Sequence, residues 1–313
     1  MRKFLITGAA GFIPSSLAER LLEDENNLVV GIDNFLTGKK GNLPQAKNFK
    51  FIKADVNSFE DLSAVMLSYR FDYVFHYAAV VGVKRTLENP LLVLNDINGI
   101  KNILHLCKNT GVTRIFFSSS SEVYGEPVEI PQNEHTTPLN SKLPYAIVKN
   151  VAEAFIKSYH QEHGLNYTIF RFFNTYGPKQ STDFVLSKFI KAALENKDIT
   201  IYGDGMQTRT FCFIDDNIDA TIKSLSDNRT VNKVINLGSD KEITILDLAN
   251  LVIDLLQSSS KIVHCPPLKE GDMQRRCPDN RKMLELLGRN LVPLEEGVKK
   301  TIRAMTEREL MKH

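Results

Sequence analysis

Tyr145 and Lys149 stand four residues apart, the spacing that puts two side chains on one face of a helix. A nearby ammonium group favours phenolate over phenol. It would therefore lower the pKa of the tyrosine from about 10 towards neutrality and make the phenol a general base. The pair follows a serine run, Ser118 to Ser121, and a carboxylate, Glu122. We expect the chemistry of the protein to be centred on this segment.

A glycine-rich turn, Gly8-Ala9-Ala10-Gly11, links the first apolar run to a helical pattern. Such a turn lets the backbone approach a pyrophosphate, whose charge then lies at the N-terminus of the helix. Asp33 follows Gly8 by 25 residues (33 − 8) and ends the next apolar run. A carboxylate there can accept hydrogen bonds from a ribose diol and repel a 2′-phosphate. We therefore expect NAD, not NADP, as the cofactor.

The elements that must position these residues alternate regularly through the first half of the chain. Apolar runs of strand length are separated by patterns of helix length, which is typical of right-handed crossovers and a parallel, doubly wound sheet. The expected strands, each buried on both faces, are Lys3–Thr7, Leu28–Asp33, Phe49–Ala54, Tyr73–Tyr77, Arg114–Ser118 and Thr168–Phe172. The expected helices are Ser15–Glu23, Asp61–Ser68, Leu91–Lys108 and Ala146–His163. The fold class is therefore α/β, with a Rossmann-type sheet.

The alternation weakens after about residue 175. The later elements are predicted as a helix at Asp183–Glu195, a turn-rich segment at Tyr202–Gln207, a strand at Thr210–Ile214 and a final helix at Leu294–Thr306. We interpret residues 1–175 as the NAD-binding domain and residues 176–313 as a smaller α/β lobe that binds substrate, with some interleaving of segments.

Composition excludes several classes of protein. The 39 Lys and Arg residues nearly balance the 37 Asp and Glu residues, so the dense basic face of a nucleic-acid binder is absent. No apolar run is long enough for a transmembrane helix. The four cysteines form no C-x-x-C pair and are too sparse for a disulfide scaffold. We expect a cytoplasmic protein that binds neither membranes nor metals.

Ordered motifs along nearly the whole chain resemble the extended short-chain dehydrogenase/reductases that act on nucleotide sugars as epimerases, dehydratases and decarboxylases. The matching segments are TGAAGFI from Thr7, IDNFLTG from Ile32, Ala54-Asp55-Val56, His76-Tyr77-Ala78-Ala79, the serine run, YAIVK from Tyr145, FNTYGP from Phe173, Tyr202-Gly203-Asp204-Gly205, Gln207-Thr208-Arg209 and Asp215-Asp216.

The resemblance implies a role for each matching residue. Tyr145 would remove a sugar hydroxyl proton, Lys149 would hold the nicotinamide ribose, and Ser120 would bond the same sugar oxygen. Ser121 and Glu122 join these three as candidate catalytic residues. Cofactor contacts, besides Tyr145 and Lys149, are implied for Gly8, Gly11, Phe12, Ile13, Asp33, Asn34, Gly38, Asp55, Val56, Ala78 and Ala79. Contacts to a UDP-sugar are implied for Asn174, Tyr202, Arg209 and Arg276.

The motifs indicate the family more specifically than they indicate the reaction. Ser121-Glu122 resembles the UDP-glucuronate decarboxylases, which form UDP-xylose, and less closely the GDP-mannose dehydratases, whereas glucose dehydratases carry aspartate in place of Ser121. The segment Val81–Pro90 resembles the uronate 4-epimerases, yet Asp96 stands where epimerases typically carry asparagine. All would act through a 4-keto sugar. We favour the decarboxylase, then a UDP-sugar 4-epimerase (glucose/galactose or uronate), then a 4,6-dehydratase.

Pro14 departs from the family pattern, because a third glycine usually stands there. Proline is tolerated in a first helical turn, although it removes one amide from the phosphate-binding turn. A non-catalytic NAD-binding scaffold therefore remains a second class of function, and the intact Ser120, Tyr145 and Lys149 argue against it. The family commonly forms homodimers through helices that correspond to Leu91–Lys108 and Ala146–His163.

Overall fold

The computed structural model describes residues 1–267 and 275–310. A seven-stranded sheet has the order β11-β6-β5-β4-β1-β2-β3, and every pairing among β1 to β6 is parallel. Its strands are β1 (Arg2–Thr7), β2 (Asn27–Asp33), β3 (Phe49–Lys53), β4 (Tyr73–His76), β5 (Arg114–Ser120), β6 (Asn166–Phe172) and β11 (Lys233–Leu237). The strand order reverses between β1 and β4, which confirms the predicted doubly wound fold.

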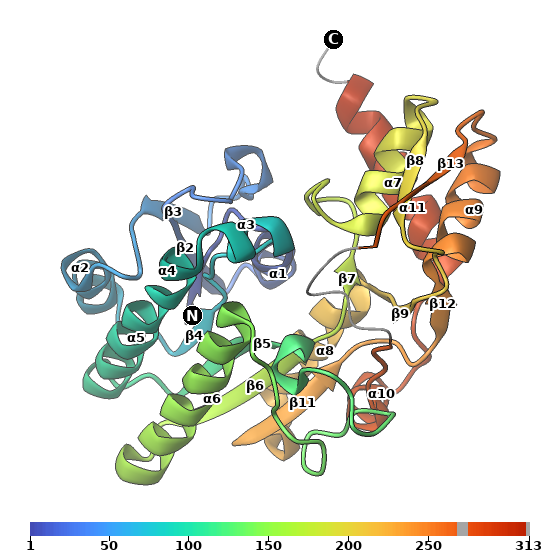
Figure 1. Cartoon of the computed structure of the whole chain (residues 1–313). Helices are drawn as coiled ribbons and strands as arrows, with labels where there is room; N and C mark the ends of the chain where they lie inside the picture. The colour runs from blue at the N-terminus through green and yellow to red at the C-terminus, as the bar shows by residue number, and fades with distance from the viewer. Residues whose placement is uncertain (268–274, 311–313) are drawn as a thin grey trace. The chain divides into compact units, whose positions relative to one another are not determined.

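Helices connect the strands, and α2, α5 and α6 lie side by side along the sheet (Figure 1). Their apolar residues, including Leu62, Ile103 and Val148, form one core cluster with Leu5 and Ile115 of the strands. The helices of this part are α1 (Phe12–Leu22), α2 (Phe59–Tyr69), α3 (Val83–Glu88), α4 (Pro90–Leu94), α5 (Asp96–Thr110) and α6 (Pro144–His163), with 3₁₀ turns η1 (Lys40–Asn42) and η2 (Ser121–Tyr124).

The helix expected over Leu91–Lys108 is two helices. Pro90 starts α4, and the helix is interrupted at Asn95, where the Asn98 N–H donates to the Asn95 carbonyl three residues back. That tighter bond is of the 3₁₀ type, which ends a run of regular α-helical bonds. Asp96 therefore becomes the first residue of α5.

Four stacked phenylalanines line the other face of the sheet. Phe75 and Phe116 stack with their ring centroids 4.5 Å apart, and Phe4 and Phe170 extend the row on either side. All four rings are fully buried. The expectation of burial on both faces is wrong for β3, which contains no fully buried residue. The reason is its position, because β3 is the last strand in the order and has one unpaired edge.

The chain folds into two compact units, and the first contains residues 1–125, 138–172 and 221–235. Arg114, at the start of β5, donates to the carbonyls of Ser224 and Leu225 at 2.9 and 2.7 Å. The hydroxyl of Thr168 in β6 donates to the Thr230 carbonyl at 2.9 Å. These bonds attach the late segment 221–235 to strands formed much earlier in the chain.

The second unit contains residues 126–137, 173–220 and the described part of 236–313. Its strands form two-stranded ladders: β7 (Thr175–Tyr176) with β10 (Cys212–Phe213), β8 (Ile199–Tyr202) with β13 (Ile262–Cys265), and β9 (Thr208–Thr210) with β12 (Glu242–Thr244). The remaining helices of the chain are α7 (Val185–Leu194), α8 (Ile214–Ser226), η3 (Asn228–Thr230), α9 (Ile245–Leu256), α10 (Arg281–Leu287) and α11 (Leu294–Leu310).

The single strand expected over Thr210–Ile214 is divided. Thr210 pairs with Glu242 of β12, whereas Cys212 pairs with Thr175 of β7, so the strand changes partner at the residue between them. Ile214 already begins α8. Within the described residues, no helix is long and apolar enough to cross a membrane.

Candidate active site

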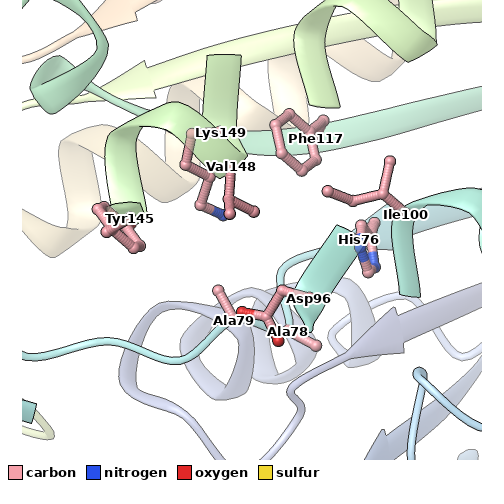
Figure 2. Close-up of a pocket in the computed structure, with 9 residues that line it drawn as sticks. All are labelled: His76, Ala78, Ala79, Asp96, Ile100, Phe117, Tyr145, Val148 and Lys149. Atoms are coloured by element: carbon pink, nitrogen blue, oxygen red, sulfur yellow. The ribbon is translucent and has the colours of Figure 1, made fainter. Parts of the chain in front are cut away.

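A pocket opens in the first unit near the carboxyl ends of β4 and β5 (Figure 2). It adjoins the point where the strand order reverses, which is where open α/β sheets bind their ligands. Tyr145, Val148 and Lys149 come from α6 on one side, and Ala78, Ala79 and Asp96 lie across from them. The nine residues that line the pocket are His76, Ala78, Ala79, Asp96, Ile100, Phe117, Tyr145, Val148 and Lys149.

The predicted catalytic residues meet at one side of this pocket. The Tyr145 hydroxyl is hydrogen-bonded to the Ser120 side chain, whose oxygen also accepts the Glu122 N–H at 3.2 Å. Ser120 ends β5 and caps η2, so the turn brings Glu122 next to the phenol. Ser121 is buried in the same turn. The structure therefore brings the serine, tyrosine and glutamate together, as the sequence predicted.

The predicted ionisation of Tyr145 is wrong for this structure. Desolvation at the pocket wall, and next the negative charge of Glu122, raise the pKa of the phenol above its ordinary value. The Lys149 ammonium instead donates to the Ser118 carbonyl at 2.6 Å, and its nitrogen lies 5.7 Å from the centre of the Tyr145 ring. Burial lowers the pKa of Lys149 to about 8, against the opposing charges of Asp96 and Glu153.

The glycine turn has the geometry of a dinucleotide cradle. Gly8 has a φ of 71°, and a Cβ there would lie 2.9 Å from the Ala78 Cα, so only glycine fits against the loop that follows β4. Gly11 caps α1, whose first two residues, Phe12 and Ile13, carry N–H groups that have no acceptor within a helix. Pro14 comes after both, as the third helical residue, so its ring leaves those two amides in place.

Asp33 closes over this turn from the end of β2. Its carboxylate accepts the Ala10 N–H at 3.0 Å and the Phe35 N–H at 2.6 Å. Burial raises the pKa of the carboxyl, and these two amides oppose that effect. A Cβ on Gly38 would lie 2.8 Å from one carboxylate oxygen, so glycine is required for the close approach. The cradle and its carboxylate fit a pyrophosphate and an adenosine ribose.

The predicted adenine contacts lie next to Asp33. The Asn34 side chain donates to the Asp55 carboxylate at 3.1 Å. Val56 packs against Gly99 of α5, where an added Cβ would lie 2.9 Å from a Val56 methyl carbon. The structure therefore gathers the predicted cofactor residues along the carboxyl ends of β1 to β4.

Two polar side chains at the carboxyl ends of β1 and β4, Thr7 and His76, were not among the predicted site residues. The Thr7 hydroxyl accepts the N–H groups of Tyr77 and Ala78 at 3.0 Å each, so its own proton is directed to Nδ1 of His76, 3.0 Å away. His76 is therefore neutral, and burial, with the nearby charge of Lys149, lowers its pKa to about 3. His76 therefore serves the structure of the pocket and not acid–base chemistry.

A buried ion pair behind the catalytic turn was also missed. Arg171 of β6 donates to the Glu153 carboxylate at 2.9 and 2.7 Å. The Ser119 hydroxyl donates to the same carboxylate at 2.6 Å, and the half-exposed Lys157 ammonium lies 3.6 Å from it. Arg171 also donates to the Tyr124 hydroxyl at 2.9 Å. The available signal was Glu153 itself, which continues the four-residue spacing of Tyr145 and Lys149 along α6.

The four predicted substrate residues all belong to the second unit. The Asn174 amide donates to the Thr210 carbonyl at 3.0 Å, and Arg209, in β9, donates to the Thr208 carbonyl at 2.7 Å. Arg276 is 5% exposed, whereas Tyr202, at the end of β8, is 39% exposed. Arg209 is thus part of β9, and the Asn174 side chain is hydrogen-bonded to the same strand.

Comparisons with known proteins identify the family of the chain. The sequence matches the NAD dependent epimerase/dehydratase family over residues 4–238. It is 36% identical to UDP-glucuronic acid decarboxylase 1 of Danio rerio, over 96% of this chain and 72% of that protein. It is also 36% identical to UDP-N-acetyl-alpha-D-glucosaminuronate decarboxylase of Bacillus cytotoxicus, over 98% of each protein. The fold matches UDP-glucuronic acid 4-epimerase of Bacillus cereus, solved with UDP-glucuronic acid and NAD, with a TM-score of 0.89, 32% identity and coverage of 98% of this chain and 99% of that one. The resemblance drawn from the motifs is confirmed, and the chain belongs to the NAD dependent epimerase/dehydratase family of enzymes.

Proposed function

We propose that the protein decarboxylates UDP-glucuronate to UDP-xylose through a transient 4-keto sugar. The observation that carries this proposal is the Glu122 carboxylate, which lies near enough to Tyr145 to raise the pKa of the phenol. An epimerase needs no such carboxylate, because it only rotates the 4-keto sugar so that the hydride returns to the other face of C4. The sequence identity to two nucleotide-sugar decarboxylases supports the same reaction.

We assign a separate role in the oxidation step to each residue around the phenol. Tyr145 takes the proton of the sugar 4-hydroxyl, and Ser120, which already shares a hydrogen bond with it, holds the same oxygen. NAD, when bound, would supply the hydride acceptor and a positive charge on its oxidised nicotinamide that favours the phenolate. Lys149 adds its own positive charge from its position at the Ser118 carbonyl.

Loss of carbon dioxide then follows from the ketone. The C5–C6 bond breaks, its electron pair enters the 4-keto group as an enolate, and C5 takes up a proton in place of the lost carboxylate. Return of the hydride to C4, with the Tyr145 proton going to the C4 oxygen, would then give UDP-xylose and restore the oxidised cofactor. We assign Glu122 to that proton transfer, since it is the carboxyl group next to Tyr145. Asn174, Arg209 and Arg276 are the residues we assign to the UDP pyrophosphate, because arginine matches phosphate oxygens with two parallel donors. We assign Tyr202 to the base of the nucleotide.

A 4-epimerase of UDP-glucuronate is the second candidate. The segment Val81–Pro90 supports it, because its sequence resembles that of the uronate 4-epimerases. The similarity to the Bacillus cereus 4-epimerase supports it as well.

Product analysis by NMR with UDP-glucuronate and NAD separates the two. A decarboxylase gives carbon dioxide and a nucleotide pentose, whereas an epimerase gives a uronate inverted at C4. The variant Glu122→Gln should slow decarboxylation by roughly 100-fold or more, the usual size of an acid–base contribution. Glu162→Gln, an exposed carboxylate near the end of α6, is the control. A C4-inverted uronate as sole product, or full decarboxylation by Glu122→Gln, would refute the proposal.

We further propose a homodimer through α4, α5 and α6. Leu91 and Leu94 of α4 and Ile147 of α6 are 80%, 37% and 40% exposed, which is unusual for a group of large apolar side chains on packed helices. Sedimentation should give a dimer that Leu91→Arg weakens, and a monomer in the unmodified protein would disprove it. All four cysteines carry free thiols, which suits a cytoplasmic protein.

A further inference from the structure

Asp96 is the acidic side chain of the pocket. One carboxylate oxygen accepts the Val80 N–H at 2.8 Å, and the Asn57 side chain donates a second hydrogen bond. These bonds hold the carboxylate on the side of the pocket opposite α6, where Figure 2 shows it facing the group formed by Tyr145 and Lys149. It is therefore fixed in place, and its charge acts on whatever the pocket holds.

The charges of the lining residues can be counted from their surroundings. His76 is neutral, because its Nδ1 accepts the Thr7 proton, and Tyr145 is a phenol of raised pKa. Lys149 supplies one positive charge and Asp96 one negative charge. With asparagine in place of Asp96, the lysine charge would be unbalanced and would repel a positively charged ring.

We propose that Asp96 determines which redox form of the cofactor the pocket prefers, by binding NAD⁺ more tightly relative to NADH than an uncharged residue would. In the oxidation step, a hydride carries two electrons and one hydrogen nucleus from the sugar carbon to the nicotinamide, while the hydroxyl proton goes to Tyr145. The nicotinamide ring thereby loses its positive charge. A fixed carboxylate stabilises only the charged form, so Asp96 favours return of the hydride and regeneration of NAD⁺ in each turnover. The proposal requires that the nicotinamide binds in this pocket, and it holds for either sugar reaction.

Cofactor binding without any sugar tests the proposal. Fluorescence titration gives the Kd of NADH, and competition gives the Kd of NAD⁺, for the unmodified protein and for Asp96→Asn. Asparagine keeps an oxygen for the Val80 N–H, and it removes the charge together with one of the two carboxylate acceptors. We expect the ratio of the NADH Kd to the NAD⁺ Kd to fall by about ten-fold to 1,000-fold. The upper value corresponds to one charge removed at about 4 Å in a medium of effective dielectric about 20.

Asp72→Asn is the matched control. Asp72 also accepts a backbone N–H, that of Lys3 at 2.7 Å. It precedes β4, so it lies at the amino ends of the strands, whereas the pocket lies at their carboxyl ends. Its ratio should stay within about two-fold of the unmodified protein, because exposed charges far from a site are screened. An unchanged ratio in Asp96→Asn, or an equal fall in Asp72→Asn, would overturn the proposal.

A second measurement on the unmodified protein covers the case in which Asp96→Asn does not fold. Protonation of Asp96 removes the same charge, and burial raises the pKa of this carboxyl above the ordinary value for aspartate, so the ratio should fall as the pH is lowered from 7. The groups that face Asp96 are Lys149 and Tyr145 on α6, His76 on β4 and Asp55 after β3, and Glu122 on η2 lies next to Tyr145. The pKa of Lys149 is lowered to about 8 and that of His76 to about 3. Asp55→Asn and Glu122→Gln should each keep the pH dependence of the ratio, and a ratio that is flat with pH would contradict the proposal.

Discussion

The two units of the chain contain the same kind of ion pair in opposite surroundings. Arg171 and Glu153, in the sheet unit, lie 2.7 Å apart with side chains 2% and 1% exposed. Arg281 and Asp279, in the second unit, lie 2.6 Å apart with side chains 79% and 10% exposed. The two distances differ by only 0.1 Å, so burial and not contact distance separates the two pairs.

The difference in burial between the two ion pairs reflects which elements each pair connects. The Glu153 carboxylate also accepts the Ser119 hydroxyl, so the buried pair ties α6, which carries Tyr145, to β5, which carries Ser120. The exposed pair joins two residues of one loop and helix start. We therefore expect rate and stability to depend on buried polar groups of the sheet unit, and substrate affinity to depend on the second unit.

The largest effect should come from Tyr145→Phe, which removes the acid–base group and keeps the ring. The rate should fall by about 100-fold to 10,000-fold, while NAD stays bound, because the dinucleotide cradle is unchanged. Turnover measured with UDP-glucuronate, beside NAD affinity, checks this. Tyr159→Phe, on the same helix, is the control. Retained turnover in Tyr145→Phe would remove the phenol from the mechanism.

Arg171→Ala should destabilise the fold by about 3–5 kcal/mol, because it leaves the Glu153 charge buried with only the half-exposed Lys157 ammonium, 3.6 Å away, as its ion-pair partner. Arg281→Ala should cost less than about 1 kcal/mol, the usual value for an exposed pair. Urea unfolding of both variants measures the free energies. Equal losses would mean that burial does not distinguish the two units.

Arg209→Ala should raise KM for the nucleotide sugar by roughly 10-fold to 100-fold and leave kcat within a few-fold. A hydrogen bond to a charged phosphate is worth about 1.5–3 kcal/mol, and we assign this residue to binding alone. Steady-state kinetics provide both constants. Arg303→Ala, exposed on α11, is the control. A fall in kcat with an unchanged KM would move Arg209 from binding to chemistry.

The smallest effect should come from Asp33→Asn. Asparagine can still accept one backbone N–H at the glycine turn but no longer repels a 2′-phosphate, so the preference for NAD over NADP should narrow by about ten-fold. Competition binding of the two cofactors measures the preference. If the preference is unchanged, Asp33 serves only to fold the turn.

Sequence reasoning succeeded where the residues of a feature are close in the chain. Ser120 and Glu122 share one turn, and the spacing of Tyr145 on α6 required only that a helix begin there. The Gly8 turn was readable because a strand and a helix flank it. Such local patterns predict the parallel, doubly wound sheet, whereas its seventh strand, β11, comes from a later segment and was not predicted.

The failures involve contacts that exist only after assembly. Lys149 points to the Ser118 carbonyl and not to the phenol, since α6 packs over the end of β5. The partner of Glu153 comes from β6, and only the completed sheet brings Arg171 beneath the helix. The division of Thr210–Ile214 likewise depends on two separate ladders that compete for neighbouring residues.

The attachment of residues 221–235 to Arg114 has a consequence for dissecting the protein. A recombinant fragment that stops at residue 175 would lack β11, so the outer side of β6 would become an open template for intermolecular pairing. The Arg114 guanidinium would also lose its carbonyl acceptors, Ser224 and Leu225, and remain charged in an apolar setting. Such a fragment should precipitate. A fragment in which a short linker joins residues 221–235 to Phe172 should remain monomeric in solution.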